Sequence, residues 1–272
     1  MTIQHAIITG GSSGIGLALA KSLANSGWNL TLIGRNSERL NQAAQSLEIS
    51  NDRLNLQTAD VTQADQLTTV INQSIDTLGT PDLLVTSAGL AHPGHFEELS
   101  SDIFHQTMEI NYFGTLNAVQ ATAPAMRRAG QGHIVMISSG AALVGVYGYS
   151  AYCPSKFAVR GLAEVLRGEF KPDGVKVSIV YPPDTDTPQL EQENQTKPAE
   201  TFAISGNANT WQAEDVASVI LKGIKQNRFS ITPGLEMRLL GRLHSLINPL
   251  LQFYFDQLVS KVRKRTPSPD TQ

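Results

Sequence analysis

The chain of 272 residues has one cysteine, Cys153, so it can form neither an internal disulfide nor a cysteine-based metal cluster. That scarcity is typical of a reducing compartment, and we predict a cytoplasmic protein. A net charge of −3, from 21 basic and 24 acidic residues, provides no electrostatic footprint for nucleic acid. Long apolar runs are also lacking. In the C-terminal segment the longest charge-free stretch, Leu243–Phe255, contains Pro249 and is too short to span a bilayer.

Two further absences narrow the function classes. Among six histidines only His92 and His95 form a close pair, and without a third ligand they indicate no metal site. The first apolar strand pattern begins almost at the N-terminus, so we expect no signal peptide.

Short apolar runs alternate with helical patterns along the chain, which predicts an α/β fold with a Rossmann-type, doubly wound parallel sheet. Strands are expected at Ala6–Thr9, Leu30–Gly34, Leu54–Thr58, Leu83–Thr86, His133–Ile137, Val175–Val180 and Arg228–Thr232. Helices are expected at Ile15–Asn25, Ser37–Leu47, Ala64–Leu78, Phe104–Arg128 with a break, Ala151–Phe170 and Ala213–Gln226.

We expect one domain over residues 1–234, followed by a C-terminal helical extension over 235–265 and a disordered tail over 266–272. The stretch 184–210 is polar and without a regular pattern. Its length predicts an irregular functional lid rather than a plain connector.

Tyr152 and Lys156 are four residues apart, so on a helix their side chains lie on one face, one turn apart. A lysine cation favours the phenolate, and we expect it to lower the tyrosine pKa below its reference value of about 10. Such a tyrosine exchanges protons near neutral pH. The pattern alone occurs by chance in many chains, and it gains weight here from the glycine-rich turn upstream.

That turn, Thr9 to Gly16, reads TGGSSGIG and lies between the first strand and the first helix. Glycines allow the backbone to approach a pyrophosphate, and the helix N-terminus presents free N–H groups to it. The strand–turn–helix context favours dinucleotide binding over a glycine-rich loop without a ligand. The candidate binding residues are Gly10, Ser12, Ser13, Gly14, Ile15 and Gly16.

The end of the second strand indicates which dinucleotide binds. An NAD site places an acidic residue there, but this chain has Arg35, with Arg39 one turn later. Two cations favour the 2′-phosphate of NADP(H), the alternative being two solvated arginines. Asp60, followed by Val61, is placed to accept a hydrogen bond from the adenine amino group. A turn or a helix N-cap explains Asp60 equally well.

The glycine turn, Asn111, Ser139, Tyr152 and Lys156 occur together in an order that resembles the short-chain dehydrogenase/reductase family over about residues 3–235. The resemblance implies that Ser139 holds a substrate carbonyl and that Tyr152 exchanges the proton. Lys156 would lower the tyrosine pKa and bind the nicotinamide ribose, and Asn111 would order a water in a proton relay.

Each of the two supporting roles has an alternative. Ser138 is the second choice for the carbonyl contact, and Ser139 also fits a turn serine at a strand end. Asn111 also fits a residue that kinks or caps a helix.

The chain departs from the family pattern at two places. Thr86-Ser87-Ala88-Gly89 replaces the usual Asn-Asn-Ala-Gly, so Ala88 and Gly89 still allow close approach of the adenine ribose while the local hydrogen bonding differs. Pro182-Pro183 replaces Pro-Gly, and Thr187 keeps the hydroxyl expected near the nicotinamide carboxamide or the diphosphate.

The stretches Tyr181–Pro188, Lys197–Glu200 and Phe157–Pro172 resemble the 3-ketodihydrosphingosine reductases, a branch of that family that uses NADPH. The resemblance implies a hydrophobic ketone substrate, a long-chain sphingoid base precursor, and a homodimer or homotetramer. Alternatives are the same chemistry on a steroid, a retinoid or a 3-oxoacyl chain, and a catalytically weak NADP(H)-binding regulator.

Residues 235–265 are rich in leucine, isoleucine and aromatics and end in Lys261, Arg263, Lys264 and Arg265. An apolar helix with a basic end is typical of an interfacial membrane anchor, which would suit a lipid substrate. The alternative is a helix that covers the substrate cleft or a dimer surface.

Overall fold

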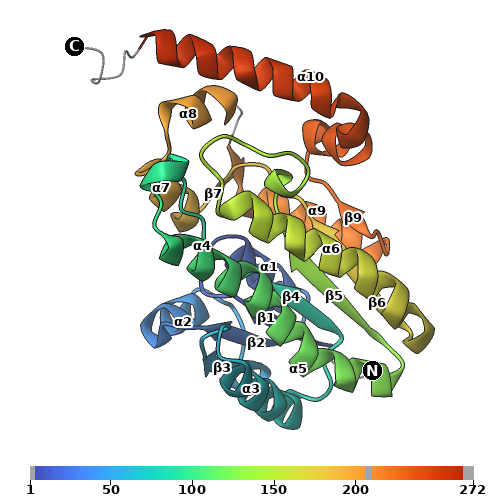
Figure 1. Cartoon of the computed structure of the whole chain (residues 1–272). Coiled ribbons are helices and arrows are strands. Elements are labelled where there is room, and N and C mark those ends of the chain that lie inside the picture. Colours follow the sequence, from blue (N-terminus) through green and yellow to red (C-terminus); the bar gives the residue numbers. More distant parts are fainter. Residues whose placement is uncertain (1–3, 206–209, 266–272) are drawn as a thin grey trace.

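The computed structural model describes residues 4–205 and 210–265. Its centre is a seven-stranded sheet in the order β3-β2-β1-β4-β5-β6-β9, with every neighbouring pair parallel (Figure 1). The strands are β1 (His5–Thr9), β2 (Asn29–Gly34), β3 (Leu54–Thr58), β4 (Leu83–Thr86), β5 (Gly132–Ile137), β6 (Val175–Val180) and β9 (Ser230–Ile231). The order reverses between β1 and β4, and such a switch point opens a crevice at the carboxyl ends of the strands.

Helices cover both faces of the sheet, as its nearly continuous apolar strands require. One face packs on α1 (Gly14–Asn25), α2 (Ser37–Gln45) and α9 (Ala213–Lys225), and the other on α3 (Ala64–Leu78), α5 (Gly114–Ala129) and α6 (Tyr152–Phe170). The doubly wound fold predicted from the alternating pattern is confirmed.

The expected break in the helix at 104–128 is a π-helical turn. Helix α4 (Ser101–Met108) continues through this turn, Glu109–Phe113, into α5. A π-turn adds a residue within a helix and is frequent at functional sites.

The stretch 184–210 was expected to be irregular, and this expectation is wrong for most of its described residues. After β7 (Thr185–Asp186), Pro188 starts α7 (Pro188–Asn194) with Thr187 as N-cap, and α8 (Ala199–Ser205) follows. Proline at the first helical position is pre-organised for a helix, and this outweighs the polar composition. Strand β7 pairs with β8 (Trp211–Gln212). Residues 206–209 of the predicted lid, and the predicted disordered tail at 266–272, lie outside the described residues.

Helix α10 (Leu235–Arg265) runs across the end of the molecule next to α8 and contains Pro249 (Figure 1). Its last turns are held by Arg263, which donates to the Tyr147 hydroxyl at 2.9 Å and lies 3.5 Å from Glu200 Oε1. No helix within the described ranges is long and apolar enough to cross a bilayer.

Candidate active site

A cavity of about 620 Å³ lies at the carboxyl ends of the strands, where the sheet order reverses. Tyr152 and Lys156 enter its wall from the first two turns of α6, and Ser139 enters it shortly after β5. The Lys156 Nζ atom lies 5.6 Å from the centroid of the Tyr152 ring. The structure thus brings together three of the four residues predicted to do chemistry.

The two neighbouring serines have different environments. The Ser138 side chain is buried and donates to the Lys156 carbonyl at 3.2 Å, which ties β5 to α6. The Ser139 hydroxyl accepts a bond from the Ala141 N–H at 3.2 Å and acts on Tyr152, whose pKa it lowers. Ser139 is therefore the serine whose hydroxyl faces the tyrosine.

Asn111 lies behind the cavity wall rather than on it. Its side chain is fully buried in the π-turn, where Nδ2 donates to the Leu90 carbonyl and Oδ1 accepts from the Leu90 N–H, each at 2.8 Å. Nδ2 also donates to Ser155 Oγ at 2.9 Å. These contacts match the alternative that Asn111 is a residue of a helix kink. Its side chain also holds the loop after β4, which forms part of the cavity wall.

The pKa of Tyr152 differs from expectation. Burial and the negative charge of Glu193 raise the pKa of Tyr152 above its usual 10.0, and the hydrogen bond from Ser139 offsets this only in part. Burial also lowers the pKa of Lys156 to about 8. The predicted lowering of the tyrosine pKa fails because desolvation of the phenolate outweighs a lysine that is itself desolvated. At neutral pH Tyr152 is consequently a phenol with a proton to give.

The glycine turn after β1 forms a cradle. Gly10 has φ +67°, and a Cβ there would lie 2.7 Å from the Ala88 nitrogen, so only glycine fits against the 87–88 backbone. A Cβ on Gly16 would overlap the Gly10 carbonyl. The N-cap residue Ser13 makes no side-chain capping bond, so the α1 N-terminus faces the cavity uncapped. These features fit a dinucleotide pyrophosphate.

The cavity is basic at the end next to α2. Ser12, Gly34, Arg35, Asn36 and Arg39 line it there. Asn36 caps α2 by accepting from the Arg39 N–H at 2.9 Å, which places that arginine in the first turn.

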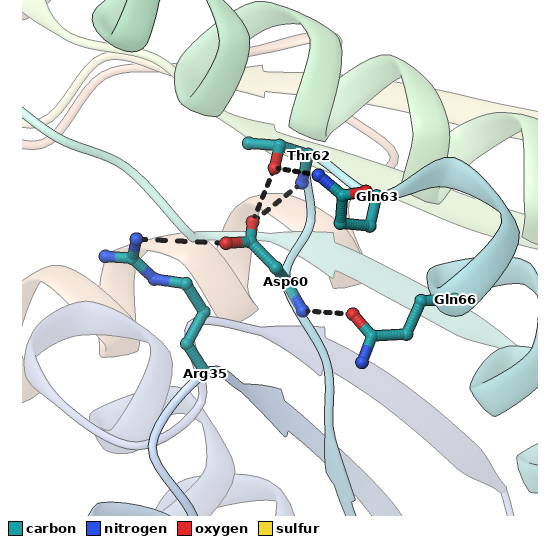
Figure 2. Close-up of polar contacts among 5 residues, drawn as sticks. All are labelled: Arg35, Asp60, Thr62, Gln63 and Gln66. Atoms are coloured by element: carbon teal, nitrogen blue, oxygen red, sulfur yellow. Dashed lines mark hydrogen bonds and ion pairs between the residues drawn. The ribbon is translucent and has the colours of Figure 1, made fainter.

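Asp60 occupies a turn next to this basic end (Figure 2). Its Oδ1 accepts from the N–H and the hydroxyl of Thr62, both at 2.9 Å, and its Oδ2 lies 3.9 Å from Arg35 Nη1. These contacts match the explanation of Asp60 as a turn residue rather than as an acceptor for adenine. Asp60 does not line the cavity, whereas Val61 does.

The other predicted cofactor residues line the same cavity: Gly10, Ser12, Ser13, Gly14, Ala88, Gly89, Ile15, Pro182 and Thr187. Gly16 lies behind them in the turn. The Thr187 hydroxyl is occupied as the N-cap of α7, because it accepts from the Leu190 N–H at 3.3 Å.

Sequence reasoning missed Glu193 on α7. This carboxylate is 8% exposed, lines the cavity, and accepts a hydrogen bond from the Tyr149 hydroxyl at 2.8 Å. The stretch 184–210 looks polar throughout, so nothing in its pattern distinguishes Glu193 as the acidic residue that is both buried and on the cavity wall.

A family model described as short chain dehydrogenase matches residues 4–198. The chain belongs to the short-chain dehydrogenase family. The resemblance inferred from the glycine turn and from Ser139, Tyr152 and Lys156 is thereby confirmed.

Two relatives and one solved structure place the chain within this family. A Danio rerio protein named 3-dehydrosphinganine reductase is 39% identical over 251 residues, covering 90% of this chain and 76% of the relative. A Dictyostelium discoideum 3-ketodihydrosphingosine reductase is 38% identical over 277 residues, covering 95% and 83%. The alcohol dehydrogenase from the archaeon Thermococcus sibiricus, complexed with 5-hydroxy-NADP, superposes with a TM-score of 0.73 at 25% identity, covering 85% of this chain and 95% of that one. As a short-chain dehydrogenase, the chain is an oxidoreductase with a nicotinamide cofactor.

Proposed function

We propose that this short-chain dehydrogenase uses NADPH to reduce a lipid ketone, 3-ketodihydrosphingosine, to dihydrosphingosine. The observation that carries the proposal is the continuity of one cavity. It extends from the glycine turn and two arginines, past Ser139, Tyr152 and Lys156, to an apolar end under α10. The names of the Danio rerio and Dictyostelium discoideum relatives support the same substrate.

In this reaction the bound nicotinamide supplies the hydride to the ketone carbon. Negative charge then grows on the carbonyl oxygen, where the hydroxyls of Ser139 and Tyr152 both donate. Tyr152 delivers its proton to that oxygen. Lys156, buried and donating to the Ile137 carbonyl at 3.2 Å, holds a positive charge near the phenolate that remains. The raised pKa of Tyr152 keeps its hydroxyl protonated at neutral pH, so the proton that reduction needs is in place.

We infer NADPH rather than NADH from the basic end of the cavity. Arg35 and Arg39 both line it there, and the neighbouring carboxylate of Asp60 is turned towards Thr62 and Arg35 (Figure 2). Two cations at the end of the cavity next to α2, with Asp60 off the cavity wall, suit a 2′-phosphate.

The far end of the cavity suits a long alkyl chain. Its lining there is mainly apolar, with Leu90, Val144, Val146, Ile204, Met237, Leu240 and Phe255. Helix α10 contributes the last three of these, so it covers the substrate cleft, as one of the two readings of the sequence expects.

The opposite face of α10 supports the other interpretation of this segment, an interfacial membrane anchor. Leu239, Leu243, Leu246, Leu250 and Phe253 recur every three or four residues and are 40–77% exposed. We propose that this stripe rests on the cytoplasmic face of a membrane, where a helix with one apolar face and a basic end binds. Flotation with anionic vesicles tests this: replacing Leu246 and Leu250 with serine should abolish flotation, and unchanged flotation would contradict it.

We further propose that α5 and α6 form a homodimer or homotetramer interface, because Phe113, Phe157 and Val165 are exposed on them or at their start. A monomer in light scattering would contradict this.

We also propose that residues 1–234 form the catalytic domain and that residues 235–265 form its helical extension.

The deciding experiment is NADPH oxidation, followed by absorbance, with 3-ketodihydrosphingosine in mixed micelles. Turnover that disappears in Tyr152→Phe supports the proposal. NADPH binding without turnover of this ketone would favour the same chemistry on a steroid, retinoid or 3-oxoacyl ketone, which should then be assayed. Binding without turnover of any ketone would favour an NADP(H)-binding regulator.

A further inference from the structure

Three carboxylates line the cavity among the described residues, namely Asp184, Glu193 and Glu236. Only Glu193 is buried. Its Oε2 accepts from the Tyr149 hydroxyl at 2.8 Å and its Oε1 from Gln189 Nε2 at 2.9 Å. Within the part of the chain that the structure describes, no lysine, arginine or histidine lies within 4.0 Å of this carboxylate.

A buried carboxylate without a cationic partner is costly to the fold. Two neutral donors occupy only part of its capacity, because an ionised carboxylate has about four lone-pair sites. The remaining capacity faces a cavity that accepts a ligand. A cationic group on that ligand would complete the missing ion pair.

Glu193 also lies next to the reacting position. The rings of Tyr149 and Tyr152 are 5.5 Å apart between centroids, and Tyr149 donates directly to Glu193. The charge of Glu193 acts on both Tyr152 and Lys156. A substrate whose ketone oxygen meets Tyr152 would therefore present its neighbouring carbon atoms to Glu193.

On the basis of the proposed function, we propose that Glu193, braced by Tyr149, binds the ammonium group that 3-ketodihydrosphingosine carries on the carbon beside its ketone. Glu193 is then the residue that selects 2-amino ketones. Steroid, retinoid and 3-oxoacyl ketones lack this cation and would leave a buried charge unpaired, which disfavours them.

The test compares two ketones that differ in one group: 3-ketodihydrosphingosine and the same molecule with hydrogen in place of the amine. The wild type should prefer the amino ketone. Glu193→Gln keeps the shape and an acceptor for Tyr149 but removes the charge. It should lower kcat/KM for the amino ketone by about tenfold to a hundredfold, mainly through KM, as expected for losing a charged hydrogen bond.

For the amine-free ketone, Glu193→Gln should change kcat/KM by less than about threefold. Glu191→Gln, at an exposed position of α7, is the matched control and should change kcat/KM for neither ketone. Tyr149→Phe leaves the charge but removes its brace, and should give a smaller loss confined to the amino ketone.

Equal losses on both ketones in Glu193→Gln would overturn the inference, because an effect through the Tyr152 pKa or through the fold does not depend on the amine. An unchanged kcat/KM for the amino ketone in Glu193→Gln would overturn it too. A wild type that reduces both ketones equally well overturns this inference alone. A wild type that binds NADPH but reduces neither overturns the proposed function, and this inference with it.

Discussion

The side chain of Asn111 brackets the backbone of Leu90, donating to its carbonyl and accepting from its N–H, each at 2.8 Å. The bracket fixes the loop that follows β4. A Cβ placed on Gly89 would lie 3.3 Å from Asn111 Oδ1 and 3.6 Å from Lys156 Nζ. The same amide therefore sets the distance between this loop and the lysine.

Replacing Asn111 with leucine should lower the free energy of unfolding by about 2–4 kcal/mol, because three hydrogen bonds of a buried side chain are lost and the Leu90 groups stay unpaired. Turnover should fall as well, since the loop is released beside Lys156. Urea unfolding measures the first effect. Asn117→Leu, which removes one bond to the Val61 carbonyl, is the matched control and should cost about 1 kcal/mol. Equal losses of unfolding free energy in the two variants would contradict the role of Asn111 in holding the Leu90 backbone.

Tyr152→Phe should abolish ketone reduction while NADPH binding, followed by its fluorescence, stays within about twofold of the wild type. The hydroxyl is the proton donor, whereas the ring occupies the same buried volume in both. Retention of more than a few per cent of turnover would assign the proton to another group.

Reduction should slow at alkaline pH with an apparent pKa near 8. The pKa of Lys156 is lowered to about 8, so its cation is lost there, while the pKa of Tyr152 is raised and the phenol persists. Lys156→Arg keeps the charge at high pH and should remove this inflection from the kcat profile. An inflection that stays in place would assign it to another group.

Arg35→Ser combined with Arg39→Ser should lower kcat/KM for NADPH by at least about tenfold and leave NADH within about threefold, because both cations line the adenosine end. Steady-state kinetics with the two cofactors measures the ratio. Arg128→Ser, an exposed arginine at the end of α5, serves as control. Parallel losses with NADH and NADPH would show that the arginines do not read a 2′-phosphate.

The sheet was predictable because its central strands β1, β2, β4 and β5 are short apolar runs that are almost wholly buried. Strands β3, β4 and β6 have the expected bounds. The glycine turn followed from its strand–turn–helix context, and the Tyr152–Lys156 pair followed from its spacing together with that turn. The pKa of Tyr152 did not, because burial and a charge from α7 decide it, and neither is local in sequence. Glu193 escaped for the same reason: only the packing of α7 over the cavity distinguishes it from the exposed Glu191 beside it.

His133 makes the fold sensitive to acid. The side chain is 7% exposed on β5, and burial, followed by the charge of Lys176, lowers its pKa to about 4. The Ser178 hydroxyl donates to the Arg228 carbonyl at 2.6 Å, so His133 Nε2, 2.7 Å from that hydroxyl, must donate to it as a neutral ring. The ring stays neutral in the folded chain until the pH approaches 4.

Between pH 6.5 and 4 the unfolded chain therefore binds the extra proton, and stability is lost as the pH falls through this range. From pH 7 to pH 5 the loss due to His133 should be about 2 kcal/mol. His133→Gln keeps the donor to Ser178 and should reduce the measured pH dependence by that amount in urea unfolding at the two pH values. His105→Gln, at an exposed position of α4, should leave the pH dependence unchanged. If both variants kept the wild-type difference, the acid sensitivity would come from another group, and His5, whose pKa is also lowered by burial, would be the next to replace.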